Sequence, residues 1–239
     1  MKRALVTGGS GGIGAAICRQ LARDKFFVFV HANSNIETAR KIVDEIIAAG
    51  GSARAIQFDI TQRDSTETVL NELLEEAPIQ VIVNNAGVTA DTVFPAMSAA
   101  QWHRVIDVSL HGFFHVTHPL LMPMLRTRWG RIINITSVAA QIGNRGQVNY
   151  AAAKGALQSA TKALALEVAS RGVTVNAVAP GIIESAMTES VFDEGFIARV
   201  VPLQRSGRPQ EVAALVAFLA SDQAGYITGQ TISINGGMA

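Results

Sequence analysis

Thr7-Gly8-Gly9-Ser10-Gly11-Gly12-Ile13-Gly14 follows a short apolar run, Ala4-Leu5-Val6, and leads into a stretch of helical periodicity from Ile13 to Arg23. Glycines in such a loop permit a tight turn and let backbone N–H groups approach a pyrophosphate, whose negative charge is stabilised at the amino end of a helix. A glycine-rich loop alone is a weak motif, but its position between strand and helix makes it more specific. The stretch therefore predicts a dinucleotide-binding site at the start of an α/β fold.

Outward from this loop, short apolar runs alternate with longer segments of helical period. Six runs are expected to be strands: 4–6, 26–30, 81–83, 131–135, 173–178 and 231–234. Most are apolar without alternation, as parallel strands buried on both faces are. Helices are expected at 13–23, 36–49, 65–76, 101–125, 147–170 and 209–221. This alternation predicts an α/β fold, a doubly wound, Rossmann-type parallel sheet with helices on both faces, in a single domain over residues 1–239.

The composition supports this architecture and bears on partners. Hydrophobic residues make up 49% of the 239 residues and charged residues 16%, which indicates extensive burial in a core and at subunit interfaces. The net charge of +1 comes without any block of Lys and Arg, so nucleic acid is not an expected partner. No run approaches the ~18 apolar residues of a membrane span. The single cysteine, Cys18, fits a reducing compartment, and we expect a soluble cytoplasmic protein.

The glycine spacing, Thr-Gly-x-x-x-Gly-x-Gly, resembles that of the short-chain dehydrogenase/reductase family rather than the general Gly-x-Gly-x-x-Gly fingerprint. Three further elements fit the same family. Asp59 lies where the family, after its third strand, has an Asp that contacts adenine. Asn84-Asn85-Ala86-Gly87 follows the expected strand 81–83, which corresponds to the family's fourth. Pro180-Gly181 follows the expected strand 173–178, which corresponds to the family's sixth, where the family passes the nicotinamide. The resemblance covers essentially the whole chain and implies a nicotinamide-dependent oxidoreductase.

The resemblance, together with the residues that follow the second strand, indicates a set of cofactor-binding residues. They are Gly8, Ser10, Gly12, Ile13, Gly14, Asn33, Ser34, Asp59, Asn85, Ala86, Gly87, Tyr150, Lys154, Pro180, Gly181, Ile183 and Ser185. The stretch that ends the second strand, residues 30–35, has no acid to hold a ribose 2′-hydroxyl, which favours NADP(H), although the family's usual basic residues are missing too. We place the 2′-phosphate beside Asn33 and Ser34, with His31 assisting. An ordinary turn or helix cap by Asn33 or Ser34 stays open as the alternative.

Tyr150 and Lys154 are four residues apart in an expected helix, so they share one face. A phenol titrates near ~10 in isolation, and a nearby ammonium would lower its pKa towards a range useful for proton transfer. The family resemblance implies that NADPH delivers hydride to a carbonyl carbon while Tyr150 protonates the developing alkoxide. It further implies that Ser137 binds the carbonyl oxygen and that Lys154 also holds the nicotinamide ribose.

Two positions depart from the family pattern. The family has an Asn, in a Val-Asn-Leu context, that supports a proton relay from the lysine, whereas this chain reads Asp107-Val108-Ser109-Leu110. We expect Ser109 to take that place, with either a bridging water or slower turnover as the consequence. Ser185 stands where Thr is common. It lies in the region 184–202, the least regular of the chain, which we interpret as a mobile lid over the substrate.

Two other chemistries fit the sequence less well. His111, His115 and His118 fall at i, i+4 and i+7 of an expected helix and could share one face. No carboxylate or cysteine completes a zinc site there, so we expect no metal and a role in packing or interface hydrogen bonds. Ser137 lacks the Gly-x-Ser-x-Gly elbow that surrounds a hydrolase nucleophile.

Within the family the chain is most similar to β-ketoacyl-acyl-carrier-protein reductases. The segments that carry this similarity are 143–154, 167–176, 202–205, 226–230 and 235–238. The similarity implies reduction of a 3-oxoacyl thioester to the 3-hydroxyacyl thioester, in fatty-acid or related polyene or polyketide synthesis, with acyl-carrier protein as partner. Arg128 and Arg171 match positions that dock the acidic carrier, although surface arginines are often only solubilising. The family's usual state predicts a homotetramer with two-fold interfaces.

Two alternative functions stay open. The same chemistry on coenzyme A thioesters or unrelated ketones would need only a different pocket, and the fold cannot distinguish these substrates. The second alternative is a non-catalytic dinucleotide-binding protein. The intact set of Ser137, Tyr150 and Lys154 argues against it, whereas Ser109 keeps it open.

Overall fold

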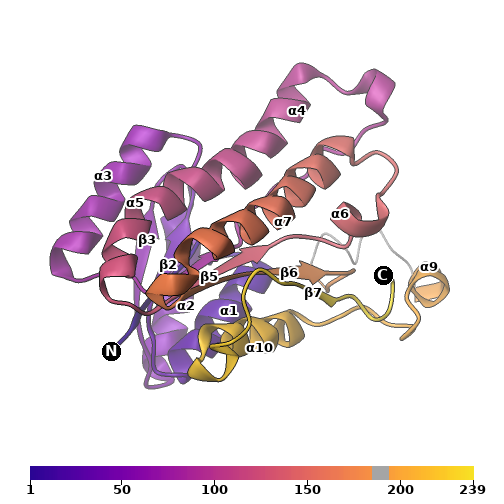
Figure 1. The fold of residues 1–239 in the computed structure, drawn as a ribbon. Helices are drawn as coiled ribbons and strands as arrows, with labels where there is room; N and C mark the ends of the chain where they lie inside the picture. Colours follow the sequence, from indigo (N-terminus) through magenta and orange to yellow (C-terminus); the bar gives the residue numbers. More distant parts are fainter. Residues whose placement is uncertain (185–193) are drawn as a thin grey trace.

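The computed structural model describes residues 1–184 and 194–239. Its centre is a parallel sheet of seven strands in the order β3-β2-β1-β4-β5-β6-β7 (Figure 1). The strands are β1 (Arg3–Val6), β2 (Phe27–Ala32), β3 (Ser52–Gln57), β4 (Val81–Asn84), β5 (Gly130–Ile135), β6 (Val173–Pro180) and β7 (Thr231–Ile234). The order reverses between β1 and β4, the point at which doubly wound folds bind ligands. The fold class expected from the sequence is confirmed.

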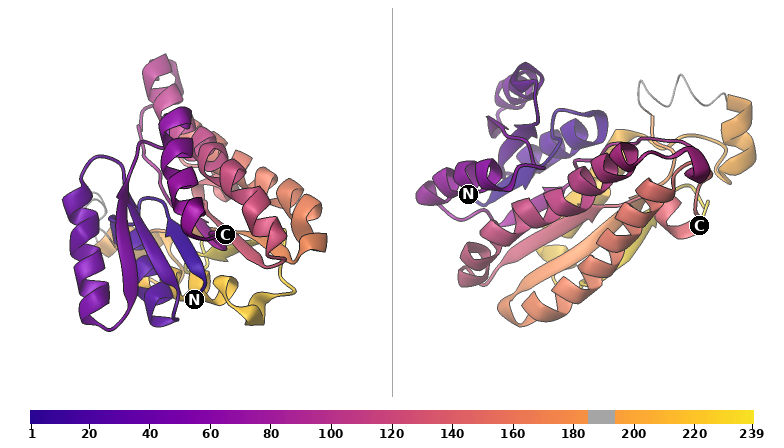
Figure 2. Two further views of the ribbon diagram at one scale, coloured as in Figure 1. Left: turned by 90° about the vertical axis from the view of Figure 1, so that its left-hand side faces the viewer. Right: turned by 90° about the horizontal axis from the view of Figure 1, so that it is seen from above.

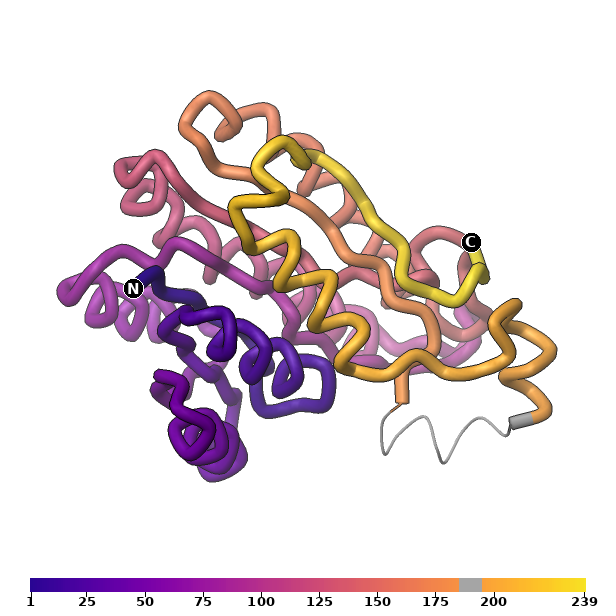
Figure 3. The backbone as a smooth tube through the Cα atoms, turned by 90° about the horizontal axis from the view of Figure 1, so that it is seen from below, coloured from indigo at the N-terminus to yellow at the C-terminus, as the bar shows by residue number. Residues whose placement is uncertain are grey.

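Helices cover both faces of the sheet. One face carries α1 (Gly12–Arg23), α2 (Ile36–Ala48) and α10 (Pro209–Ala220), and Figure 3, seen from below, shows α1 and α10 side by side in front of the strands. The other face carries α3 (Arg63–Glu76), α5 (Gly112–Arg126) and α7 (Val148–Val168), of which α7 follows the course of α5 in the right-hand view of Figure 2.

The two faces explain why the strand sequences are apolar without alternation. Successive strand residues point to opposite sides of a sheet. Ala4 and Val6 of β1 therefore pack against the α1 side, while Leu5 between them packs against the α5 side, and all three are fully buried. A strand covered on both faces thus needs an apolar residue at every position, as the sequence predicted.

Several short elements complete the chain. They are η1 (Phe94–Ala96), α4 (Ala99–Ile106), a π-helical turn η2 (Asp107–His111), α6 (Ala139–Ile142), η3 (Ala169–Arg171), α9 (Glu194–Val200) and η4 (Asp222–Ala224). The helix expected at 101–125 is thus divided by the π turn, and α6 was not expected at all. Of the predicted lid, 184–202, residues 185–193 lie outside the described residues, and 194–200 form α9.

A ladder of buried polar side chains joins the middle of the sheet to α7. Asn84 of β4 donates to Asn134 of β5 at 2.9 Å, and Asn134 donates to Thr161 of α7 at 2.8 Å. Because all three side chains lie in the interior, these bonds fix how α7 sits on the strands. Of the helices that the structure describes, none has the length and apolar character needed to cross a bilayer.

Candidate active site

The glycine-rich loop makes its turn where β1 ends at the reversal of the strand order. Gly8 has a φ of +62°, which favours glycine. A Cβ added at Gly14 would stand 2.2 Å from the Gly8 carbonyl oxygen, so only glycine allows the loop to close on the first turn of α1. That first turn has no side-chain cap and no acid. Its N–H groups therefore remain available to an anion.

The end of β4 holds this loop in place. The Thr7 hydroxyl accepts from the backbone N–H groups of Asn85 and Ala86, each at 3.0 Å. The Asn85 amide donates to the carbonyls of Thr7 and Gly8 at 2.9 and 3.1 Å. The glycine loop and the Asn-Ala-Gly element thus form one rigid unit.

His31 does not assist a phosphate, contrary to the sequence interpretation. Its ring is 1% exposed, Nδ1 accepts from the Gly8 N–H at 3.1 Å, and Nε2 donates to the Phe58 carbonyl at 2.8 Å. Burial lowers the pKa of His31 to about 4, so the ring is neutral at physiological pH. The histidine instead positions the glycine loop from behind.

Two clefts open at the carboxyl edge of the sheet. The first, of about 570 Å³, runs from the glycine loop past the end of β4 to Lys154 and Pro180. The second, of about 480 Å³, is lined by residues of the α6–α7 region, by α9 and by Met238 near the end of the chain. They share one wall, which consists of Thr89, Ser137, Tyr150, Gly181 and Ile183. The candidate catalytic hydroxyls therefore stand between two separate compartments.

The first cleft fits a dinucleotide. A Cβ at Gly12 would meet no atom within 4 Å, so the backbone here is open to a bound group, while the uncapped end of α1 offers N–H donors. Most of the expected cofactor residues line this cleft: Gly8, Ser10, Gly12, Ile13, Gly14, Asn85, Ala86, Gly87, Tyr150, Lys154, Pro180, Gly181 and Ile183. These residues would hold a nicotinamide dinucleotide.

Four of the expected cofactor residues do not line that cleft. Asn33 and Ser34 are exposed just beyond the carboxyl end of β2, and their carbonyls accept from Gln57. The Asp59 carboxylate accepts from the backbone N–H and the hydroxyl of Thr61. Ser185 lies outside the described residues. The assignment of these four to cofactor binding stays a prediction.

Ser137, Tyr150 and Lys154 converge from β5 and α7. Ser137 comes two residues after β5, its Oγ accepts from the Ala139 N–H at 3.1 Å, and its hydroxyl is near enough to the Tyr150 phenol to lower the phenol pKa. The Lys154 ammonium lies 5.7 Å from the centre of the Tyr150 ring and donates to the Ile135 carbonyl at 2.9 Å. Ser137 and Tyr150 therefore lie on the wall between the two clefts, and Lys154 lines the first cleft beside Tyr150.

The phenol differs from the sequence expectation in its pKa. Burial raises the pKa of Tyr150, the Ser137 hydrogen bond opposes this shift, and the Asp91 carboxylate adds to it. Lys154 is not among the causes. Burial lowers the pKa of the Lys154 ammonium itself to about 8. The expected lowering of the phenol pKa is thus not found, and the phenol keeps its proton at neutral pH.

Two polar side chains beside the candidate site were not singled out by the sequence analysis. Asn149 is fully buried; its amide donates to the Ala90 and Gln101 carbonyls at 3.2 Å, and its oxygen accepts from the Tyr150 N–H. Asp91 lines the second cleft and accepts from Gln147 at 2.7 Å. The sequence spacing indicated Tyr150 but gave no sign of a role for its neighbour Asn149. The loop around Asp91 reaches the site through tertiary contacts alone.

Ser109 lies inside the fold in the π turn. It is 3% exposed, and its hydroxyl has no hydrogen-bond partner among the described residues. Neither cleft is lined by it. Its place in a proton relay therefore stays a prediction.

Arg128 and Arg171 lie together, but at the opposite edge of the sheet. Arg128 precedes β5 and Arg171 precedes β6, and the Arg128 guanidinium donates to the Ser170 carbonyl at 3.5 Å. Both are exposed. Because parallel strands present their amino ends at one edge and their carboxyl ends at the other, a single chain does not place these arginines beside its own clefts.

The three histidines of the π turn and α5 have separate partners. His111 bonds to the Asp107 carboxylate at 2.9 Å, His115 bonds to the Ile60 carbonyl at 2.8 Å, and His118 lies against the Phe114 ring. Within residues 1–184 and 194–239, no three His, Cys, Asp or Glu side chains are grouped as a metal site requires.

Comparison with known proteins agrees with this geometry. A family model described as short chain dehydrogenase matches residues 2–195. The chain belongs to the short chain dehydrogenase family. In this dehydrogenase, the first cleft is large enough for a nucleotide and is lined by Ser137, Tyr150 and Lys154. The sequence analysis predicted this combination.

This short chain dehydrogenase has relatives of similar length. It is 44% identical over 236 residues to the 3-oxoacyl-(acyl-carrier-protein) reductase FabG of Aggregatibacter actinomycetemcomitans, covering 98% of both chains. It is 45% identical over 240 residues to the FabG of Staphylococcus aureus strain Mu50, covering 99% of this chain and 98% of that one. It is 47% identical over 237 residues to the 3-oxoacyl-(acyl-carrier-protein) reductase of a Synechocystis strain, covering 98% and 96%. Membership of this family implies that the cofactor of this enzyme is a nicotinamide dinucleotide.

Proposed function

We propose that this dehydrogenase is a cytoplasmic, NADPH-dependent 3-oxoacyl-(acyl-carrier-protein) reductase that forms the 3-hydroxyacyl thioester. The observation that carries the proposal is the wall shared by the two clefts, which includes both Ser137 and Tyr150. Relatives near 45% identity over nearly the whole chain carry that enzyme name. A ketone in the second cleft, which we call the substrate cleft, would have both hydroxyls at its oxygen. The first cleft, which we call the cofactor cleft, would lie behind its carbon.

The side chains divide the chemistry among them. When bound, the reduced nicotinamide would supply the hydride. Ser137 orients the carbonyl oxygen, and Tyr150 donates its phenolic proton to that oxygen as negative charge develops. The raised pKa of Tyr150 keeps this proton in place at neutral pH. Lys154 lines the cofactor cleft, where its ammonium would hold the ribose of the nucleotide.

A spectrophotometric assay tests the reaction. We expect the purified enzyme to oxidise NADPH with acetoacetyl-acyl-carrier protein, at a higher kcat/KM than with acetoacetyl-coenzyme A. Tyr150→Phe should lower kcat by about a hundredfold or more and leave NADPH binding intact, because it removes only the proton donor. Equal or better turnover of the coenzyme A thioester would favour that alternative substrate, and high residual activity of the variant would refute the assigned proton donor.

The preference for NADPH rests on the end of β2. No acid occupies residues 33–35, and the nearest one, Glu37, is paired with Arg40. A ribose 2′-phosphate beside Asn33 and Ser34 would therefore meet no carboxylate directly after the strand. We expect a lower KM for NADPH than for NADH, and Asn33→Asp should reverse the order. An unaltered preference in this variant would remove Asn33 from the phosphate site.

Carrier docking connects with the oligomeric state. Arg128 and Arg171 could serve a cleft only if a neighbouring copy brings its carboxyl edge to them, as a two-fold homotetramer would allow. Arg145, by contrast, is exposed on the loop whose Asn144 lines the substrate cleft of the same chain. Arg128→Glu with Arg171→Glu should raise KM for the carrier-bound substrate but not for a small thioester. If only Arg145→Glu does so, the carrier docks on the loop of residues 143–147.

A further inference from the structure

The substrate cleft has an uneven distribution of charge. Apart from Ser137 and Tyr150, its polar side chains are Thr89, Asp91, Asn144 and Gln147, on the side of the loop 88–98 and the start of α7. Ile142, Phe196 and Met238 supply apolar surface. Among the described lining residues, Asp91 is the only one with a charged side chain. Among these described residues, the cleft thus has one carboxylate and no side-chain cation to balance it.

The Asp91 carboxylate is fixed in this position. Gln147, the residue before α7, donates to its Oδ2 at 2.7 Å and is itself bonded to Asn144. The backbone of the same loop is tied to the α7 side by the bond from the Thr92 N–H to the Gly146 carbonyl at 2.9 Å. These bonds keep the negative charge at the cleft and leave little freedom for it to turn away.

Nearby positive charge is already engaged. The amino end of α7 carries partial positive charge, and Asp91 lies against it through Gln147. The Lys154 ammonium faces the cofactor cleft rather than the substrate cleft and is bonded to the Ile135 carbonyl. A reduced nicotinamide ring adds no positive charge. Arg145 is exposed on the adjoining loop but does not line the cleft. Among the described lining residues, an anionic substrate would therefore meet Asp91 without a compensating side-chain cation.

We propose that Asp91 is a specificity-determining residue that admits neutral 3-oxo esters and thioesters and rejects free 3-oxo carboxylates. This inference rests on the proposed function and adds to it a selectivity for uncharged substrates. In a 3-oxo acid the carboxylate is two bonds from the ketone carbon, so it enters the cleft whichever way the chain points. Esterification removes that charge and leaves the ketone unchanged. Asp91 is close enough to the catalytic centre to act electrostatically on the Tyr150 phenol, which supports its reach.

The size of the effect is limited by solvent, because Asp91 is exposed. Two like charges about 6 Å apart near a protein surface repel enough to change binding by about tenfold or more. Salt screens exposed charges. The discrimination should therefore decrease as ionic strength rises, which a purely steric selectivity would not do.

The experiment compares acetoacetate with ethyl acetoacetate, using purified enzyme and NADPH. We expect kcat/KM of the wild-type enzyme to favour the ester, and the ratio of ester to acid to fall by about tenfold in Asp91→Asn. Asparagine can still accept from Gln147, so the loop should keep its position. Asp91→Glu should keep the discrimination, and Asp64→Asn, an exposed residue at the start of α3, should leave the ratio unchanged.

The possible results separate this inference from the proposed function. An unchanged ratio in Asp91→Asn, or equal reduction of acid and ester by the wild type, overturns the role of Asp91 while the reductase function stands. An enzyme that reduces neither the ester nor any acetoacetyl thioester overturns the proposed function and the inference together. Melting temperature and NADPH affinity of the variant show whether a change in ratio comes from damage to the fold.

Discussion

At the scale of single residues, burial of the Lys154 ammonium lowers the stability of the fold. The residue is 2% exposed, its one hydrogen-bond partner among the described residues is the neutral Ile135 carbonyl, and burial lowers its pKa from 10.5 to about 8. Between those pH values the unfolded chain binds a proton that the folded chain does not, so stability from this group rises with pH. Below about pH 8 both states are protonated and the full cost of burial remains.

Lys154→Met should therefore stabilise the fold while abolishing turnover. We expect the free energy of unfolding at pH 7 to rise by about 1–3 kcal/mol, because a buried unpaired charge is replaced by an apolar side chain. The gain should shrink as pH rises from 8 to 10.5. Urea denaturation across this range measures it, with Lys162→Met, an exposed position on the same helix, as the control. A less stable Lys154→Met variant at pH 7 would contradict the argument.

Ser109 has a buried hydroxyl that has no hydrogen-bond partner among the described residues. Leaving a buried hydroxyl unpaired costs about 1–3 kcal/mol. Ser109→Ala should therefore keep or raise the melting temperature. If Ser109 takes part in the proton relay, as we propose, kcat of this variant should fall several-fold with little change in KM, and Ser109→Asn should restore it. An unchanged kcat in Ser109→Ala would remove the residue from the relay.

At the scale of elements, sequence patterns predicted those features that one segment determines by itself. The apolar runs and the glycine loop identified six strands and the turn before α1, because burial on both faces and close backbone approach each demand particular residues. The edge strand β3 lacks such a run, since four of its six residues are only half-buried. No glycine or proline marks the π turn at Asp107–His111. Its register follows from tertiary packing, such as Gly112 lying against Ile60.

The same division holds for the site. Tyr150 and Lys154 were predictable because both lie on one helix at a fixed spacing. Asp91 and Gln147 belong to different loops, 56 residues apart, and meet only in the folded chain. The role of His31 was misread because a polar residue near the end of a strand gives no sign of facing inward, towards Gly8 and Phe58.

Gly14→Ala tests the junction between the glycine loop and α1. Its Cβ would lie 2.2 Å from the Gly8 carbonyl, a backbone atom that cannot turn aside, so the loop must shift. We expect the free energy of unfolding to fall by about 1–3 kcal/mol and nucleotide binding to weaken strongly. Gly12→Ala is the matched control for stability, because its Cβ meets nothing within 4 Å. Equal stability of the two variants would show that the loop can shift to accommodate the added Cβ at little cost in free energy.

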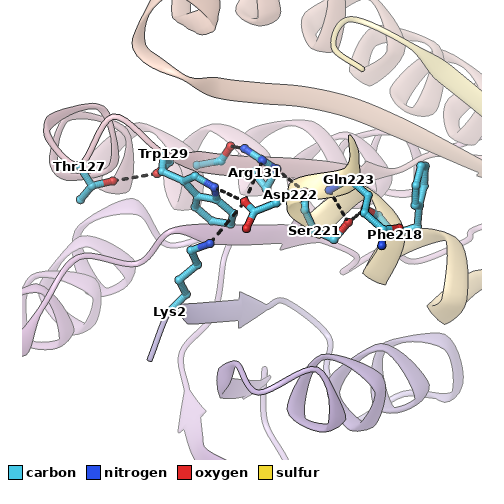
Figure 4. Close-up of polar contacts among 9 residues, drawn as sticks. Lys2, Thr127, Trp129, Arg131, Phe218, Ser221, Asp222 and Gln223 are labelled. Carbon is cyan, nitrogen blue, oxygen red and sulfur yellow. Dashed lines mark hydrogen bonds and ion pairs between the residues drawn. The ribbon is translucent and has the colours of Figure 1, made fainter. Parts of the chain in front are cut away.

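At the scale of the whole molecule, catalysis and part of the stabilisation lie at opposite edges of the sheet. The clefts occupy the carboxyl edge. At the amino edge, Asp222 accepts from the Trp129 indole at 2.7 Å and pairs with Lys2 at 3.5 Å and Arg131 at 3.7 Å (Figure 4). Lys2 also lies over the Trp129 ring, 3.6 Å from its centre. These contacts join the starts of β1 and β5 to the segment after α10.

Asp222→Asn should weaken this amino-edge cluster without affecting the reaction. The Trp129 hydrogen bond, and then the nearby cations, lower the pKa of Asp222. Its charge therefore stabilises the fold at pH values above the ordinary aspartate range, and the contribution is lost as pH falls through the lowered value. We expect a loss of about 1 kcal/mol at pH 7, limited by exposure of the carboxylate, and a smaller difference from wild type in strong acid. Because no cleft residue contacts this cluster among those described, kcat/KM should stay unchanged, and a parallel loss of activity and stability would show that the two edges are coupled.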